Sequence, residues 1–124
     1  GWAVLLVGPS GSGKSTLALE LIAMGGKLVA DDRVMLDPRP DGLWLQAPDT
    51  LRNQIEARGV GILPTPASPA RAALVVDLAN VETERLADPQ TTRIAEFELP
   101  LLRKVESPAF AAMLRLILVG DHER

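Results

Sequence analysis

The most informative segment of this sequence is Gly8-Pro9-Ser10-Gly11-Ser12-Gly13-Lys14-Ser15, which has the complete form G-x-x-x-x-G-K-S. It follows an apolar run, Ala3-Val4-Leu5-Leu6-Val7, and precedes a helical pattern that starts near Lys14. A strand, a glycine-rich turn and a helix in this order are the context in which such a motif forms a phosphate loop. The sequence therefore predicts a site for a nucleoside triphosphate.

The residue types in this motif suit phosphate groups. The glycines let successive backbone N–H groups turn into one concavity, and the N-terminus of the following helix adds partial positive charge. Lys14 would reach the β- and γ-phosphates, and the Ser15 hydroxyl would help to hold Mg²⁺. The alternative is a turn that only joins a strand to a helix. The residues expected to contact the nucleotide are Gly8, Ser10, Gly11, Ser12, Gly13, Lys14, Ser15 and Thr16.

Length and composition limit the kind of protein. The 124 residues most simply form one domain, residues 1–124, and the net charge of −3 argues against nucleic acid as the main partner. The absence of cysteine excludes disulfides, thiolate metal sites and a catalytic thiol. We see no apolar run long enough to span a membrane and no signal peptide, so we expect a cytoplasmic protein without a membrane partner.

Local patterns predict the elements that follow the motif. The helix should run to about Met24 and end at Gly25-Gly26, and Lys27-Leu28-Val29-Ala30 should form a short buried strand. Residues 33–36 and 43–46 could pair as a hairpin around a Pro- and Gly-rich turn. Trp44 is expected to pack in the core of that hairpin, and stacking on adenine is the alternative reading.

The second half of the chain gives a mixture of clear and weak signals. A short helix or turn is plausible over residues 49–58, and a strand or loop interrupted by glycines over residues 58–63. Residues 64–69 are rich in proline and suggest a connector, whereas residues 72–78 predict a buried strand.

Further along, residues 79–93 look rich in loops, and residues 94–99 alternate as a half-exposed strand would. Ser107 and Pro108 suit the start of a final helix. Together these elements predict an α/β fold with a mixed central sheet, helices on its faces and a hairpin after Asp32.

Two acidic positions could supply the carboxylate that a phosphoryl transfer needs. Asp31-Asp32 ends the strand expected after the first helix, and Asp77 ends the strand over residues 72–78. Neighbouring side chains on a strand point to opposite faces, so the first pair could divide into a proton acceptor and a metal ligand. The alternatives are Asp77 as the metal ligand and Asp31-Asp32 as a surface turn.

Several of these segments together resemble one known family. The motif at residues 8–15, then Leu28-Val29-Ala30-Asp31-Asp32 and then Ile55-Glu56-Ala57-Arg58-Gly59-Val60-Gly61-Ile62 look like the catalytic domain of the HPr kinase/phosphorylase family. The length is similar to short members without the N-terminal domain. The resemblance implies a P-loop kinase domain with a sheet like that of the phosphoenolpyruvate carboxykinase-like kinases, and it allows a homo-oligomer.

The resemblance also implies roles for individual residues. Asp31 would be the general base that takes the seryl proton of HPr, acting with Lys14 and Arg58 at the phosphate site. Asp32 and Glu56 would stand near the metal with Ser15. For Glu56 and Arg58 the alternative is a surface ion pair.

The function implied is an ATP- and Mg²⁺-dependent serine kinase that phosphorylates HPr or a related phosphocarrier and also dephosphorylates it by phosphorolysis. The alternatives are a regulatory module that senses ATP without efficient turnover and a small-molecule kinase, for which we find no arginine-rich lid segment. The family also has a Gly-Arg-Asn segment before its last helix. That segment is absent here, and Arg103 or Lys104 could supply its positive charge.

Overall fold

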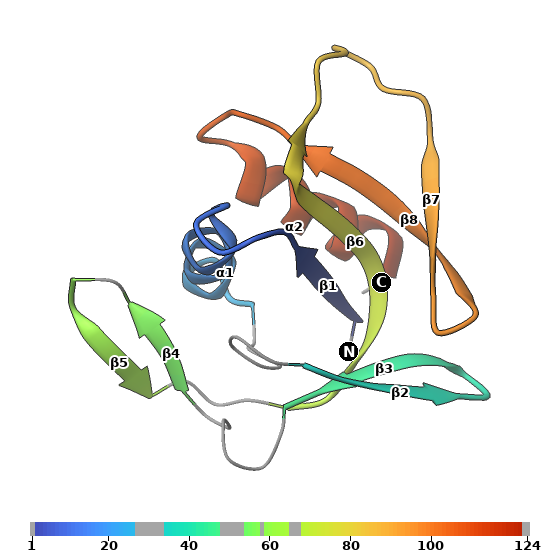
Figure 1. Ribbon diagram of the computed structural model, residues 1–124, viewed down its shortest axis with the longest axis horizontal. Coiled ribbons are helices and arrows are strands. Elements are labelled where there is room, and N and C mark those ends of the chain that lie inside the picture. Colours follow the sequence, from blue (N-terminus) through green and yellow to red (C-terminus); the bar gives the residue numbers. More distant parts are fainter. Residues whose placement is uncertain (1, 27–33, 48–53, 58, 65–67, 123–124) are drawn as a thin grey trace.

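The computed structural model describes residues 2–26, 34–47, 54–57, 59–64 and 68–122 (Figure 1). Its elements, in chain order, are β1 Trp2–Val7, α1 Lys14–Ala23, β2 Met35–Arg39, β3 Gly42–Gln46, β4 Gln54–Ala57, β5 Gly61–Pro64, β6 Ala70–Val81, β7 Gln90–Ile94, β8 Phe97–Lys104 and α2 Phe110–His122. Neither helix in these ranges is long and apolar enough to span a membrane.

The strands form a mixed sheet, as predicted. The long strand β6 is at its centre and pairs in parallel with β1 and β8, and antiparallel with β3. The hairpin partners β2 and β7 extend the sheet beyond β3 and β8. Because β1, β6 and β8 run in the same direction, their carboxyl ends meet at one edge of the sheet, where the loop after β1 begins.

A bulge in β6 decides which side chains face which side. Ala3 of β1 pairs with Ala72, but Val4 pairs with Leu74, so Ala73 is an extra residue on β6. The insertion changes the alternation of side chains, since neighbouring residues on a strand point to opposite faces. Ala72 therefore joins one buried cluster and Leu74 the other.

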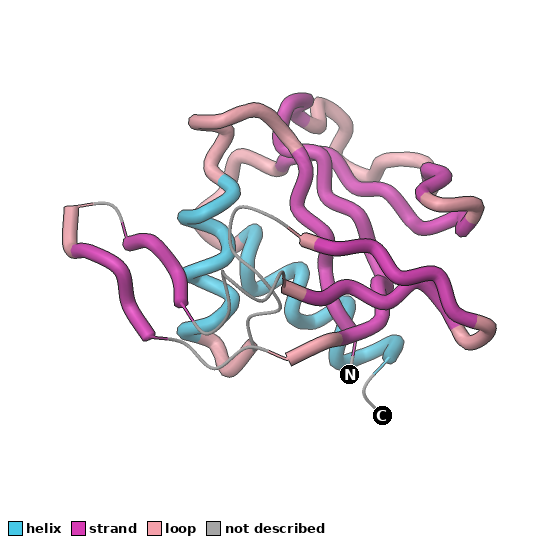
Figure 2. Tube along the Cα trace, turned by 60° about the horizontal axis from the view of Figure 1, so that its bottom comes forward, coloured by secondary structure: helices cyan, strands magenta, loops and turns pink. Residues whose placement is uncertain are grey.

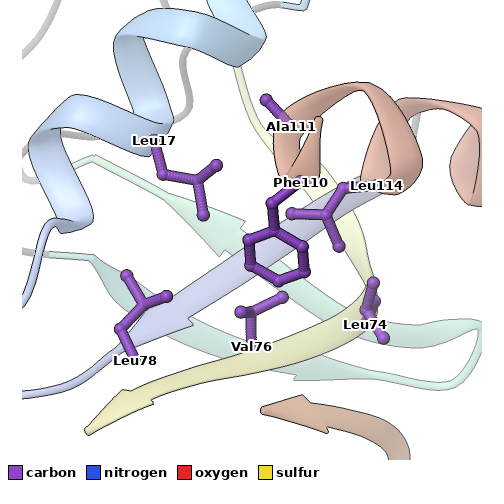
Figure 3. Packing of buried hydrophobic residues seen from close by; sticks show 7 residues of the cluster. All are labelled: Leu17, Leu74, Val76, Leu78, Phe110, Ala111 and Leu114. Carbon is purple, nitrogen blue, oxygen red and sulfur yellow. The ribbon is translucent and has the colours of Figure 1, made fainter. Parts of the chain in front are cut away.

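Both helices pack on the same face of the sheet, where they contact each other (Figure 2). Their apolar side chains meet those of β6 in one buried cluster, shown in Figure 3. Its buried members are Leu17, Leu74, Val76, Leu78, Phe110, Ala111 and Leu114. On the other face, every buried member of the second cluster comes from a strand: Ala3, Leu43, Leu45, Ala72, Val75 and Leu99. We expected helices on the faces of the sheet; within the described residues, they cover only one.

The second, smaller sheet corrects one prediction. Residues 49–58 looked like a short helix or turn, but Gln54–Ala57 is strand β4 and pairs antiparallel with β5. Ile55 and Ala57 are buried, which is the two-residue period of a strand. Gly59, with a φ of 86°, turns the chain back, so the expected glycine-interrupted strand is β5. The strand expected at residues 27–30 lies outside the described residues.

The region before the last helix also differs from expectation. Residues 94–99 do not form one strand, because Ile94 ends β7 and Phe97 begins β8 across a tight turn. Ala95 and Glu96 make that turn with φ values of 48° and 70°, which are unusual for residues other than glycine. The sequence carries no Asn-Gly or similar turn signal here, and β7 therefore went unnoticed within the segment expected to be rich in loops.

The C-terminus of α1 and the N-terminus of α2 lie where the sequence predicts them. Gly26 N–H donates to Leu21 O at 2.9 Å and Gly25 N–H to Ile22 O at 3.0 Å, which is the pattern of a Schellman C-cap. At the start of α2, the Ser107 hydroxyl accepts a hydrogen bond from Ala109 N–H at 3.1 Å, as an N-cap does. The predicted stop and start signals are confirmed.

Candidate active site

The loop of residues 8–15 (the 8–15 loop) connects the carboxyl end of β1 to the first turn of α1. Gly8, Gly11 and Gly13 have φ values of 147°, 83° and 99°. Ser12 N–H donates to Pro9 O at 3.1 Å, and Leu17 N–H donates to Gly13 O at 3.0 Å to begin the helix. The chain thus turns tightly and enters α1 with the free N–H groups of a helix N-terminus at the loop.

Gly8 is held at a crowded position of this loop. A Cβ atom at Gly8 would lie 2.8 Å from Ser12 Oγ and 3.3 Å from Ala79 N. Ser12 Oγ is itself buried and has no hydrogen-bond partner among the described residues. An unpaired buried hydroxyl is uncommon, since such a group usually finds a partner. The loop therefore contains a buried hydroxyl group whose hydrogen-bonding capacity the described residues do not use.

Two lysines bring positive charge to the loop. Lys14 Nζ donates to Gly8 O at 2.7 Å, and Lys104 Nζ donates to Ser12 O at 3.3 Å. Neither ammonium group forms an ion pair with another described residue. Lys14 was predicted from the motif. Lys104 was an open alternative, and it comes near the loop because β8 ends at the same edge of the sheet as β1.

Asp77 supports the loop from the neighbouring strand. Its Oδ1 accepts a hydrogen bond from Ala79 N–H at 2.8 Å, and its Oδ2 accepts one from Asn80 Nδ2 at 2.7 Å. These hydrogen bonds, that of Asn80 first, hold the pKa of the Asp77 carboxyl below 3.8. Both oxygens are thus engaged in shaping the segment whose backbone lies against Gly8. The arrangement gives Asp77 a positioning role, and its role as a metal ligand stays an open alternative.

The other predicted site residues are only partly placed. Ser10, Gly11, Ser15 and Thr16 are exposed on the loop and at the start of α1. Asp31, Asp32 and Arg58 lie outside the described residues. Glu56 belongs to β4, which contacts α1, but its side chain is outside the description. The structure therefore brings Lys104 to the loop and leaves the roles of the carboxylates as predictions.

Trp44 is not in the hairpin core, contrary to our expectation. Leu43 and Leu45 fill that core, whereas Trp44 is half-buried and donates from Nε1 to Asp41 Oδ1 at 2.9 Å. The Arg71 guanidinium lies 4.2 Å from the centre of the Trp2 ring and 5.7 Å from that of Trp44. Because Trp2 begins β1 and the 8–15 loop follows its end, both tryptophans are roughly 16 Å or more from the loop along the strand. This placement argues against adenine stacking on Trp44.

The chain has relatives among known proteins. A family profile described as HPr Serine kinase C-terminal domain matches residues 1–101 of the chain. The chain belongs to this family. The HPr kinase/phosphorylase of an Exiguobacterium strain is 36% identical over 116 residues, covering 82% of this chain and 37% of that protein. That of Peptoclostridium acidaminophilum is 52% identical over 64 residues, covering 51% of this chain and 21% of that protein.

A solved structure shares the fold of this HPr serine kinase C-terminal domain. The HPr(Ser) kinase/phosphatase from Coxiella burnetii matches with a TM-score of 0.75 and 24% sequence identity, over 97% of this chain and 82% of that chain. The mixed α/β fold with its central sheet is therefore that of an HPr kinase structure. The present chain nevertheless spans only 37% of the length of the Exiguobacterium relative.

Proposed function

We propose that this domain transfers the γ-phosphoryl group of ATP to a seryl hydroxyl of HPr or a related phosphocarrier. The observation that carries the proposal is the 8–15 loop, with its glycines at positive φ and the Lys14 ammonium against Gly8 O, in a chain of this family. The loop would be the phosphate loop of a P-loop kinase, and the sheet would be of the phosphoenolpyruvate carboxykinase-like type. The names of the relatives support HPr as the substrate and phosphorolysis as a second activity.

The residues of the loop fit a Mg²⁺-bound triphosphate. The helix N-terminus and the ammonium groups of Lys14 and Lys104 favour anionic oxygens, and the Ser12 hydroxyl, which has no partner among the described residues, offers a further hydrogen bond. The exposed Ser15 hydroxyl, with Asp32 and Glu56, would hold Mg²⁺. A bound Mg²⁺ would neutralise charge on the β- and γ-phosphates.

The remaining chemistry belongs to side chains of this chain. Asp31 would accept the proton of the seryl hydroxyl while the seryl oxygen forms a new bond to the γ-phosphorus. The bond between the γ-phosphorus and the oxygen that leaves with ADP would break. Lys14 and Arg58 would stabilise the negative charge on the transferred group. In phosphorolysis, inorganic phosphate would attack the phosphorus of the phosphoserine and form pyrophosphate. The bond between that phosphorus and the seryl oxygen would break, and protonated Asp31 would give its proton to the seryl oxygen.

The broader setting is part of the same proposal. We propose one domain over residues 1–124 that works in the cytoplasm on a protein substrate, without a nucleic acid or membrane partner. Assembly into a homo-oligomer is compatible with it. The competing function is a regulatory module that binds ATP and does not turn it over.

The test is transfer of label from γ-labelled ATP with Mg²⁺ to purified HPr. The wild type should label a seryl residue, and Asp31→Asn should lower the rate by about 10²–10⁴-fold while retaining ATP binding. Asp37→Asn is the matched control, because Asp37 pairs with Arg39 on the surface at 2.7 Å. Equal rates for wild type and Asp31→Asn would contradict the role of Asp31. ATP binding without any transfer would favour the regulatory module.

A further inference from the structure

Lys104 connects the end of β8 to the 8–15 loop. Its backbone is fixed by β6, because Lys104 pairs with Val81 and its carbonyl oxygen accepts a hydrogen bond from Glu82 N–H at 2.8 Å. Its half-buried side chain extends to the loop, where Nζ donates to Ser12 O at 3.3 Å. Figure 1 shows the end of β8 at the edge of the sheet where the loop begins. A strand far along the chain thus holds an ammonium group against one carbonyl of the loop.

The direction of the Ser12 carbonyl determines the direction of the Gly13 N–H group. None of the described peptide bonds is cis, so the C=O and N–H groups of this peptide point in opposite directions. Lys104 lies on the carbonyl side, and the Gly13 N–H group therefore faces away from Lys104. This N–H group donates to no described residue. It belongs to the part of the motif whose N–H groups surround phosphate in a phosphate loop.

The backbone of Gly13 does not by itself favour this orientation. If the peptide plane between Ser12 and Gly13 rotated by half a turn, its carbonyl and N–H groups would exchange places, and the φ of Gly13 would change from 99° to a negative value. Glycine adopts both signs of φ about equally readily. In the rotated form a carbonyl oxygen would face the phosphate oxygens and repel them. A contact outside Gly13 therefore has to select the orientation that accepts phosphate.

We propose that Lys104 is a positioning residue, whose contact with Ser12 O keeps the Gly13 N–H group turned toward the nucleotide phosphates. The effect on ATP binding rests on the proposed function, whereas the orientation of the peptide plane is a property of the ligand-free chain. A lysine suits this role, because a hydrogen bond from a charged donor is stronger than one between neutral groups. Lys14 contacts Gly8 O in the same way at 2.7 Å, so a lysine fixes a carbonyl near each end of the loop.

The experiment compares the ligand-free wild type with Lys104→Met and Lys104→Arg by NMR. The nuclear Overhauser effect between Ser12 Hα and the Gly13 amide proton reports the orientation of the peptide plane, because the distance between these protons depends on the ψ of Ser12. Lys104→Met should change this effect and shift the Gly13 amide resonance, since methionine has no hydrogen-bond donor. Lys104→Arg keeps a charged donor and should resemble the wild type.

Arg103→Met is the matched control, because it removes the same charge from the preceding residue of β8. Arg103 is exposed and forms no hydrogen bond with a described residue, so this variant should keep the wild-type signals of Ser12 and Gly13. Calorimetry with Mg²⁺-ATP then measures the consequence for binding. Lys104→Met should bind ATP at least about tenfold more weakly than the wild type, and Lys104→Arg should stay within about threefold.

A second measurement needs only the wild type. A Cβ atom at Gly13 would lie 3.8 Å from Lys104 Nζ, so the Gly13 Hα proton in that direction should show a nuclear Overhauser effect with the Lys104 Hε protons. Its absence would overturn the proposal, even if Lys104→Met failed to fold.

Two other outcomes separate this proposal from the proposed function. If Lys104→Met kept the wild-type effect between Ser12 and Gly13, the positioning role would be overturned, and weaker ATP binding by that variant would show that Lys104 contacts the phosphates directly. If the wild type bound no ATP but the ligand-free chains gave the expected effects, the positioning of the loop would stand and the proposed function alone would fail.

Discussion

Gly8 is the residue of the loop whose replacement should have the clearest effect. An alanine Cβ there would lie 2.8 Å from Ser12 Oγ, at a backbone φ of +147° that side chains rarely adopt. We expect Gly8→Ala to weaken ATP binding by at least about tenfold, because the loop must move to relieve both problems. The measurement is calorimetric titration with Mg²⁺-ATP.

Gly11→Ala is the control for this prediction. Gly11 also has a positive φ, +83°, but apart from its chain neighbours no atom of the described residues lies within 4 Å of an added Cβ. In the unliganded loop, the cost of Gly11→Ala is therefore conformational, about 1–2 kcal/mol in the left-handed region. Equal free energies of unfolding of the two variants, measured by urea denaturation, would show that close packing at Gly8 is unimportant.

Asp77 predicts a pH dependence of stability. Hydrogen bonds from Asn80 and Ala79 lower the pKa of the Asp77 carboxyl below 3.8 in the folded state, so the folded state binds the proton less readily than the unfolded chain. The stability that Asp77 contributes is therefore present above pH 3.8 and is lost as pH falls through the lowered pKa.

Asp77→Asn should remove this pH-dependent contribution to the free energy of unfolding. Urea midpoints measured at about pH 6 and about pH 3 should fall further for the wild type than for Asp77→Asn. Asp88→Asn, an exposed aspartate after β6, is the control and should behave as the wild type. An equal fall for wild type and Asp77→Asn would contradict the inferred hydrogen bonding.

Among single residues, the sequence predicted position best where a motif specifies a backbone conformation. Gly8, Lys14 and Ser15 could be predicted, because G-x-x-x-x-G-K-S specifies their places in one loop. Lys104 could not be chosen over Arg103, because it reaches Ser12 from 92 positions away along the chain. Lys104 lies at the carboxyl end of β8, which runs parallel to β1. This position would have favoured Lys104, but the sequence did not show where β8 ends.

The β7–β8 hairpin carries a prediction at the level of elements. Ala95 and Glu96 form its turn with φ values of 48° and 70°. A positive φ destabilises most residues, but asparagine and glycine adopt it at little cost. The double variant Ala95→Asn/Glu96→Gly should raise stability by about 1 kcal/mol, seen as a higher melting temperature. Glu96→Ala keeps the Cβ atom and should leave the melting temperature nearly unchanged. A lower melting temperature of the double variant would contradict the turn geometry.

Pairing between distant or neighbouring segments explains why some elements escaped prediction. The apolar strand β6 and the capped helix α1 carry their own signals in period, length and end residues. The strand β4 has only four residues, and its antiparallel partner β5 provides the hydrogen bonds that define it. Pairing between segments, rather than local propensity, decides the structure there.

At the scale of the whole molecule, the cluster between the helices and the sheet should dominate stability. Leu114 is 0% exposed in that cluster, whereas Leu116 is 73% exposed on the same helix. Leu114→Ala should lower the free energy of unfolding by about 2–5 kcal/mol through lost burial and a cavity. Leu116→Ala should change it by less than about 0.5 kcal/mol. Urea denaturation of both variants checks this, and equal losses would contradict the packing of α2.

The measurement that most directly tests the account is the affinity for Mg²⁺-ATP of wild type, Lys14→Ala and the control Arg93→Ala. Lys14 belongs to the 8–15 loop, and Arg93 is exposed on β7. If the loop binds the triphosphate, the wild type and Arg93→Ala should bind ATP alike, and Lys14→Ala should bind it at least about tenfold more weakly. Equal ATP affinity of Lys14→Ala and wild type would contradict the assignment of the 8–15 loop as the nucleotide site.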